Sequence, residues 1–405
     1  MIARISTLPR GAVIALSAVV TLVLAWRVLV VGMDALQQRA DATDQHAAGT
    51  TPGKAADAPW RERLARNPAD ATALLKLAID LEAQGKKVEA GAAMQQALRL
   101  APGDLQTLMQ TAAYFLRAGD EAQGLVTLRR AIDASRGDVN SSVWEVFLAA
   151  LDADRHRAFF DGIARDNPAW WPGFFRLACE RAANVGAVQA VYAMRVQAAV
   201  ATVDEQRCII GRLQRDGQWA TAYQLWLNGL PVDQRQRVGA VFNGDFELPL
   251  SNVGFDWLVP TQDGIEVTRQ PIDGATGQRA LNVTFVNKRY SEPPVYQYLM
   301  LNPGTYRFEG RGRTDLESWL GLQWGVYCND APGREPRQLA HSDRFVGSVD
   351  WRDFRQDFAV PKDCPVQLLR LELANPKRDA NTAGAVVVRL KGRVWFDALR
   401  VRLLD

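Results

Sequence analysis

The stretch NPADATALLKLAIDLEAQGKKVEAGAAMQQALRLAPGD, residues 67–104, decides the fold of the first half of this chain. Its first four residues and its last four share a proline in second place and an aspartate in fourth place, 34 positions apart. Between them, apolar residues recur every three or four positions, which predicts two amphipathic helices. Gly85 falls in the turn between these helices, and Pro102 ends the second one. The stretch therefore predicts a helical hairpin that repeats along the chain.

A second copy of the hairpin follows the first. The repeat positions hold Leu74, Leu77, Ala78, Leu81, Gly85, Ala90, Met94, Ala97 and Pro102 in the first copy, and Leu108, Thr111, Ala112, Phe115, Gly119, Gly124, Leu128 and Ala131 in the second. In length and pattern, residues 68–135 resemble tetratricopeptide repeats. The pattern restarts at Asn167, and Gly217 and Trp226 keep the turn and second-helix positions of a last copy. We therefore expect a tetratricopeptide-like α-solenoid over residues 60–238.

This resemblance implies a protein partner for the helical region, because repeats of this kind mediate protein contacts. Trp170 and Trp171 are candidates for lining a partner-binding groove. The alternative is that both rings fill the core between neighbouring repeats. For the region as a whole, the alternative is a spacer that holds the C-terminal domain away from a membrane.

An apolar run at the N-terminus predicts a membrane anchor. Residues 11–33 contain a single charge, Arg27, and as a helix with a rise of about 1.5 Å per residue they reach the roughly 30 Å of a bilayer core. Arg4 and Arg10 place residues 1–10 in the cytoplasm by the positive-inside rule. The rest of the chain then lies in the periplasm, anchored in a bacterial inner membrane.

A cleaved signal peptide is the alternative, because residues 40–42 have the small-x-small pattern of a cleavage site. The apolar run is longer than the usual signal-peptide core, which favours the anchor. Residues 34–59 have no apolar period and are predicted to be a flexible spacer.

From Phe242 onward the apolar residues change from helical spacing to alternation. The alternating segments are Leu281-Val283-Phe285, Tyr306-Phe308, Leu320-Leu322-Trp324-Val326, Leu369-Leu371-Leu373 and Val394-Phe396. Turn-forming residues such as those at 302–304 separate them. Residues 242–405 are therefore predicted to form an all-β sandwich of two sheets.

Several motifs in this half occur in the order found in one group of modules. They are Asn243-Gly244-Asp245-Phe246-Glu247, Gly277-Gln278-Arg279-Ala280-Leu281, Pro303-Gly304-Thr305-Tyr306 and the closing Val394-Trp395-Phe396-Asp397-Ala398. Together they resemble jelly-roll carbohydrate-binding modules. One departure is Ala398, which stands where the closing motif of those modules has a second aspartate.

The resemblance implies a structural calcium ion between the first and last strands, with Glu247 and Asp397 as its ligands. The alternative is that Glu247 is a solvated turn residue and Asp397 accepts backbone hydrogen bonds. No other cofactor is expected.

The resemblance also implies contact with polysaccharide through exposed aromatic rings. Tyr296, Tyr298 and Trp319 are the glycan-binding candidates. Trp324 shares a face with core residues, and Trp351 belongs to a W-x-x-F pattern, so both are predicted to lie in the core.

Cys328 and Cys364 flank two predicted strands of the sandwich. In an oxidising periplasm they are expected to form a disulfide, which contributes about 3–4 kcal/mol for a loop of this length. Two buried free thiols are the alternative.

Composition excludes several classes of function. The net charge of +3 gives no electrostatic footprint for nucleic acid, and only three histidines are present. The sequence contains no phosphate-binding loop and no hydrolase or metalloprotease motif, so no enzyme is expected. The whole arrangement resembles non-catalytic accessory proteins of bacterial exopolysaccharide synthesis and export. The alternative is a membrane-anchored scaffold that binds only proteins.

Overall fold

The computed structural model describes residues 58–290, 293–329, 335–374 and 388–404. The predicted anchor (residues 11–33) lies outside the described residues, as does nearly all of the predicted spacer. Among the helices that the structure describes, none combines the length and the apolar character needed to cross a bilayer. The chain divides into two compact units between Ala201 and Thr202.

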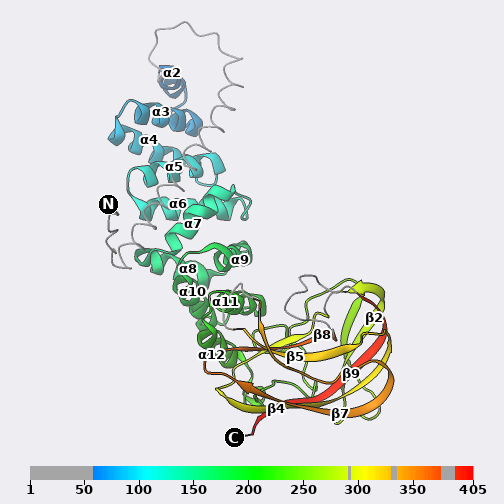
Figure 1. Cartoon of the computed structure of the whole chain (residues 1–405). Coiled ribbons are helices and arrows are strands. Elements are labelled where there is room, and N and C mark those ends of the chain that lie inside the picture. Colours follow the sequence, from blue (N-terminus) through cyan, green and yellow to red (C-terminus); the bar gives the residue numbers. More distant parts are fainter. Residues whose placement is uncertain (1–57, 291–292, 330–334, 375–387, 405) are drawn as a thin grey trace, which may run out of the picture. The chain divides into compact units, whose positions relative to one another are not determined.

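The first unit is helical, as Figure 1 shows. Its elements are α2 (Ala58–Arg66), α3 (Ala71–Ala83), α4 (Lys87–Leu100), α5 (Leu105–Arg117), α6 (Glu121–Ala134), α7 (Ser141–Leu151), the 3-10 turn η1 (Asp154–His156), α8 (Arg157–Asp166), α9 (Trp171–Arg181) and α10 (Val185–Gln197). Asp70 and Asp104 cap α3 and α5 by accepting hydrogen bonds from the N–H groups of Ala73 and Thr107.

The helices of the first unit form the predicted hairpins. Gly85 and Gly119 have φ values of 76° and 85°, the left-handed conformation that the turns inside the two hairpins require. Ala90 and Ala97 of the first copy and Ala112 and Ala131 of the second are completely buried, as expected where helices cross closely. The hairpin predicted from residues 67–104 is therefore confirmed.

The second unit begins with three helices and continues into strands. Its elements are α11 (Val203–Arg215), α12 (Trp219–Gly229), α13 (Val232–Arg235), β1 (Ile265–Gln270), β2 (Ala280–Tyr290), β3 (Tyr296–Leu299), β4 (Gly304–Glu317), β5 (Leu322–Cys328), β6 (Arg337–His341), β7 (Gly347–Val360), β8 (Gln367–Leu373) and β9 (Val388–Leu403). The strands form two antiparallel sheets, ordered β1-β2-β9-β4-β7 and β3-β8-β5-β6. This is the predicted sandwich, and its core contains the apolar residues of all five alternating segments.

Helices α11 and α12 pack against the sandwich rather than standing apart from it. The ring centroid of Trp226 in α12 lies 5.1 Å from that of Phe242 and 5.7 Å from that of Phe255. The Arg207 side chain donates hydrogen bonds to backbone carbonyls of the segment between α13 and β1. The change from helix to strand near residue 240 therefore does not separate two compact units.

Candidate functional site

The outward face of the five-stranded sheet is charged. Along β4, Tyr306 and Phe308 point into the core, and because side chains alternate along a strand, Arg307, Glu309 and Arg311 point outward. The neighbouring strands β7 and β9 add further charged groups to the same face. This face is therefore rich in groups that can bind a polar ligand.

A hollow of about 780 Å³ lies on this face, a volume within the usual range of ligand sites. It is lined by Thr276, Glu309, Gly310, Arg311, Asp343, Asp353, Phe354, Arg355, Ala398 and Arg400. Three neighbouring strands, β4, β7 and β9, supply most of these residues. The loops that precede β2 and β7 supply Thr276 and Asp343. The hollow is therefore built mainly on regular strands, which hold side chains more precisely than loops do.

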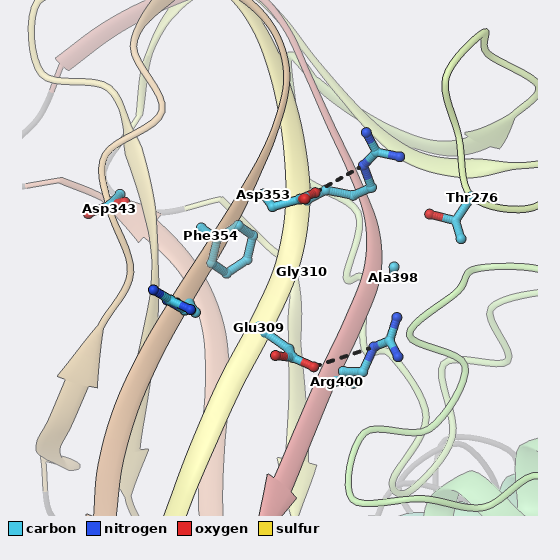
Figure 2. Close-up of a pocket in the computed structure, with 10 residues that line it drawn as sticks. Thr276, Glu309, Gly310, Asp343, Asp353, Phe354, Ala398 and Arg400 are labelled. Carbon is cyan, nitrogen blue, oxygen red and sulfur yellow. Dashed lines mark ion pairs between the residues drawn. The ribbon is translucent and has the colours of Figure 1, made fainter.

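Two ion pairs cross the hollow, and Figure 2 shows both. Arg311 of β4 lies 3.4 Å from the Asp353 carboxylate of β7, and Arg400 of β9 lies 3.9 Å from the Glu309 carboxylate of β4. Each pair presents hydrogen-bond donors and acceptors side by side. Arg355, also exposed, forms no ion pair with any residue that the structure describes.

A further ion pair extends the charged face along β4 and β7. The guanidinium of Arg307 donates two hydrogen bonds to Asp357, at 2.6 and 2.7 Å. These bonds lower the pKa of the Asp357 carboxyl. The Arg307–Asp357 pair therefore favours the ionised form of the Asp357 carboxyl.

Trp351 lies on the outward face, so its predicted place in the core is wrong. In an extended strand, residues three apart point to opposite faces, and the core contains Phe354. The guanidinium of Arg311 lies 5.4 Å from the Trp351 ring, and the indole N–H donates to the carbonyl of Asp273. The two-residue period of a strand therefore predicts that the Trp and the Phe of a W-x-x-F pattern lie on opposite faces of the sheet.

Trp395 is a second aromatic residue of this face that the sequence did not single out. Arg313 lies 5.5 Å from its ring, in the register where β4 pairs with β9. The side chain is 7% exposed, and its indole N–H has no hydrogen-bond partner among the described residues. Arginine and tryptophan side chains thus stack on one another beside the hollow.

The two tyrosine candidates lie elsewhere, on β3 at the edge of the four-stranded sheet. The Tyr298 ring packs against Trp219 of α12, with centroids 4.9 Å apart. Burial raises the pKa of the Tyr298 hydroxyl to about 12, and it also raises the pKa of Tyr296. Both tyrosines are half-buried; the Tyr298 ring contacts a helix, and the Tyr296 ring lies beside it.

Trp319 is the most accessible of the three glycan-binding candidates. It lies between β4 and β5 and is 75% exposed. It does not line the hollow, and no described aromatic ring contacts it. Among the described residues, the Tyr296 and Tyr298 rings contact each other, and neither contacts the ring of Trp319. Trp324, by contrast, is completely buried, as predicted.

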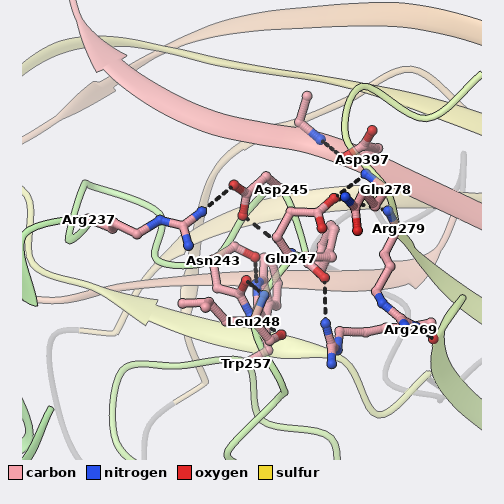
Figure 3. Close-up of polar contacts among 12 residues, drawn as sticks. Arg237, Asn243, Asp245, Glu247, Leu248, Trp257, Arg269, Gln278, Arg279 and Asp397 are labelled. Atoms are coloured by element: carbon pink, nitrogen blue, oxygen red, sulfur yellow. Dashed lines mark hydrogen bonds and ion pairs between the residues drawn. The ribbon is translucent and has the colours of Figure 1, made fainter. Parts of the chain in front are cut away.

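Glu247 and Asp397 both hold the loop that leads into β2, as Figure 3 shows. One Glu247 oxygen accepts hydrogen bonds from the N–H groups of Gln278 and Arg279, at 2.6 and 2.9 Å. Asp397, fully buried, accepts from the N–H groups of Thr276 and Ala398. In the part of the chain described, no cluster of three metal-ligating side chains is present. The structural calcium stays an expectation from the sequence.

The predicted disulfide is present. Cys328 at the end of β5 is bonded to Cys364 ahead of β8, with Cα atoms 5.6 Å apart. The alternative of two free thiols is therefore wrong for this pair. Cys179 and Cys208 are not in a disulfide.

The two groove candidates of the helical unit are mostly core residues. Trp171 is completely buried and Trp170 is 7% exposed. The indole N–H of Trp170 donates to the Asp133 carboxylate at 2.7 Å. Trp170 nevertheless lines a hollow of about 450 Å³ on the first unit, whereas Trp171 does not.

Comparison with known proteins gives matches only among solved structures; no family model and no curated sequence matches this chain. The module CBM4 has a TM-score of 0.30 and 16% identity, over 40% of this chain and 99% of its own. The xylan-binding domain CBM22-1 of Paenibacillus barcinonensis Xyn10C has a TM-score of 0.27 and 16% identity, over 37% of this chain and 86% of its own. TmCBM61, solved with β-1,4-galactotriose, has a TM-score of 0.27 and 15% identity, over 41% of this chain and 99% of its own. At such scores and identities, nothing about a ligand follows from these likenesses for this chain.

Proposed function

We propose that this chain is a non-catalytic assembly factor of the bacterial envelope, anchored in the inner membrane, whose sandwich contacts a glycan in the periplasm. Its helical region binds a protein partner, and the process served is exopolysaccharide synthesis or export. The hollow on the outward face of the five-stranded sheet is the single observation that carries the glycan-binding part.

The chemistry of the hollow suits a polyhydroxylated chain. Sugar hydroxyls donate and accept hydrogen bonds at once, and each of the two ion pairs offers both kinds of partner. Hydrogen bonds to charged groups are stronger than those between neutral groups. Arg355 is exposed and forms no ion pair with a described residue, although its charge helps to lower the pKa of the nearby Asp357 carboxyl, so its guanidinium is accessible to a ligand.

The glycan-binding proposal is tested by titrating the full chain with acidic and neutral polysaccharides. Losing a hydrogen bond to a charged group costs about 1.5–3 kcal/mol, so Arg355→Ala should weaken binding roughly 10- to 100-fold. Arg393→Ala is the matched control, because Arg393 is an exposed arginine of the same sheet that does not line the hollow. No binding at millimolar concentration, or equal losses in both variants, would refute the proposal.

The aromatic candidates give a second test in the same titration. A stacking ring contributes about 1–2 kcal/mol, so Trp319→Ala should weaken binding about 5- to 30-fold if the glycan reaches the β4–β5 turn. Tyr296→Ala tests the half-buried edge of β3 in the same way. Tyr298→Ala should instead lower stability, because its ring packs on Trp219.

The alternative is a scaffold in which both units bind proteins and no sugar is recognised. The contact between Tyr298 and Trp219 favours this alternative, since it leaves less of the Tyr298 ring free to stack on a sugar. The polysaccharide titration separates the two candidates directly.

A further inference from the structure

The hollow of the first unit is a groove with an aromatic floor. It is lined by Arg136, Gly137, Trp144, Ala169, Trp170, Gly173, Phe174, Arg176, Leu177 and Glu180. These residues come from the turn between α6 and α7, from α7, and from α9 with the segment before it. We call this hollow the α7–α9 groove.

Among the aromatic side chains that line the groove floor, Trp144 is the one whose ring is partly exposed to the groove. It is only half-buried, whereas Trp170 and Phe174 are buried. The Trp144 ring stacks on Phe174 at 5.7 Å with an interplanar angle of 28°, and it contacts Trp170 at 5.6 Å. The hydrogen bond from Trp170 to Asp133 fixes the neighbouring ring. The floor is therefore a pre-ordered apolar surface.

One face of α9 forms a wall of the groove. Gly173, Leu177 and Glu180 recur at helical spacing and lie on one side of the helix. A Cβ atom added at Gly173 would meet no atom within 4 Å. Gly173 thus leaves open space where any other residue would project into the groove.

Two cations flank this floor without a partner of their own. Arg136 and Arg176 are exposed, and neither guanidinium forms a hydrogen bond or an ion pair with a residue that the structure describes. Arg136 adjoins Gly137, which lies against Trp170 at the start of α9, and Glu180 lies near the other end of that helix. The lining therefore carries two cations, Arg136 and Arg176, and one acid, Glu180, which lies one helical turn beyond Arg176.

We infer that the α7–α9 groove binds an acidic peptide segment of a partner protein. An apolar side chain of the segment packs on Trp144, and carboxylates of the segment pair with Arg136 and Arg176. Arginine favours carboxylates because its planar guanidinium donates two parallel hydrogen bonds to them. This inference rests on the proposed protein-binding role of the helical region.

A randomised twelve-residue peptide library displayed on phage, selected on the full chain, tests the inference. The selected peptides should carry Asp or Glu next to an aromatic or aliphatic residue, and their binding should weaken as salt is added. Selection of peptides without acidic residues, or of no peptides, would overturn the inference. Displacement of the selected peptides by a neutral oligosaccharide would assign the groove to sugar and overturn it as well.

Two variants at exposed positions test where the peptide binds without disturbing the hydrophobic core. Gly173→Leu should fill the groove and weaken binding of a selected peptide more than 10-fold, while Arg176→Glu should weaken it by a similar factor. Gly162→Leu is the control, because Gly162 also lies in a helix of this unit with open space around its Cβ position, and it does not line the groove. If Gly162→Leu weakens binding as much as Gly173→Leu does, or if Gly173→Leu has no effect, the peptide binds elsewhere and the inference fails.

Photo-crosslinking separates this failure from failure of the protein-binding role itself. A photoreactive residue is placed at Gly173 in one variant and at Val126, an exposed position of α6, in another. A protein that crosslinks to the Val126 variant and not to the Gly173 variant would support the protein-binding role of the helical region, and it would refute binding in the α7–α9 groove. The peptide selection and the Gly173→Leu result decide the groove in either case.

Discussion

Replacing Trp226 of α12 should destabilise the whole sandwich, although this residue belongs to the last predicted helical repeat. Its side chain is 2% exposed and contacts the rings of Tyr223, Phe242 and Phe255. A Cβ added at Gly254 would come within 2.6 Å of the Trp226 ring, so the backbone there packs directly on the indole. Truncating a buried tryptophan to alanine costs about 3–5 kcal/mol, because it leaves a cavity that the surroundings fill only in part.

Hydrogen exchange followed by mass spectrometry measures this loss in the full chain. The slowest amides of β2 and β9 report global opening of the second unit. A loss of about 3–5 kcal/mol should speed their exchange by roughly two to three and a half powers of ten. The slowest amides of α3 and α5 give the internal reference, because these helices belong to the first unit.

Trp319→Ala is the matched control for Trp226→Ala. It removes the same type of side chain from the same unit, but Trp319 is 75% exposed. The free energy of opening that exchange in β2 and β9 reports should therefore change by less than about 0.5 kcal/mol. If Trp226→Ala accelerates exchange only within α11 and α12 and leaves the strands protected, the helical hairpin is not part of the sandwich core. That result would refute the reasoning.

Three further predictions concern the disulfide, a helix cap and the anchor. Cys328→Ser should lower the stability of the second unit by about 2–4 kcal/mol in denaturant titrations, and wild-type protein under reducing conditions should behave alike. Asp104→Ala should lower the stability of α5, measured by hydrogen exchange, by about 0.5–2 kcal/mol, because the Thr107 N–H loses its acceptor. Unchanged exchange in α5 would show that the cap does not stabilise this helix. A reporter fused after Asp405 should be active in the periplasm and the protein should stay in the membrane fraction; a mature N-terminus near residue 43 would show instead that residues 11–33 are a signal peptide.

The sequence predicted those features that depend on period and spacing. The turns at Gly85 and Gly119 follow from a 34-residue repeat, and the buried positions of β2 and β5 follow from alternation. The disulfide between Cys328 and Cys364 followed from their places beside strands and from the inferred compartment. In each case, the information lies within a short stretch or in a single pair of residues.

The features that the sequence did not predict depend on contacts between distant segments. The Tyr298 ring packs on Trp219, and no local sequence pattern relates a strand residue to a helix that lies far earlier in the chain. Trp351 was assigned to the core by a motif, whereas strand alternation places it on the outward face beside Arg311. The hollow combines side chains of β4, β7 and β9, which are neighbours only in the folded sheet.

The covered tyrosine also determines which part of the chain suits a glycan-binding experiment. A fragment of residues 242–405 would lack Trp219 and Trp226, and it would expose the rings of Tyr298, Phe242 and Phe255 that they cover. Exposed aromatic rings stack on sugar faces, so such a fragment would acquire a binding surface that the intact chain does not have. Binding seen with residues 242–405 and lost with the full chain would therefore mark this artificial surface. Binding through the hollow should be retained in the full chain, since the charged residues that line it lie on the outward face of the other sheet.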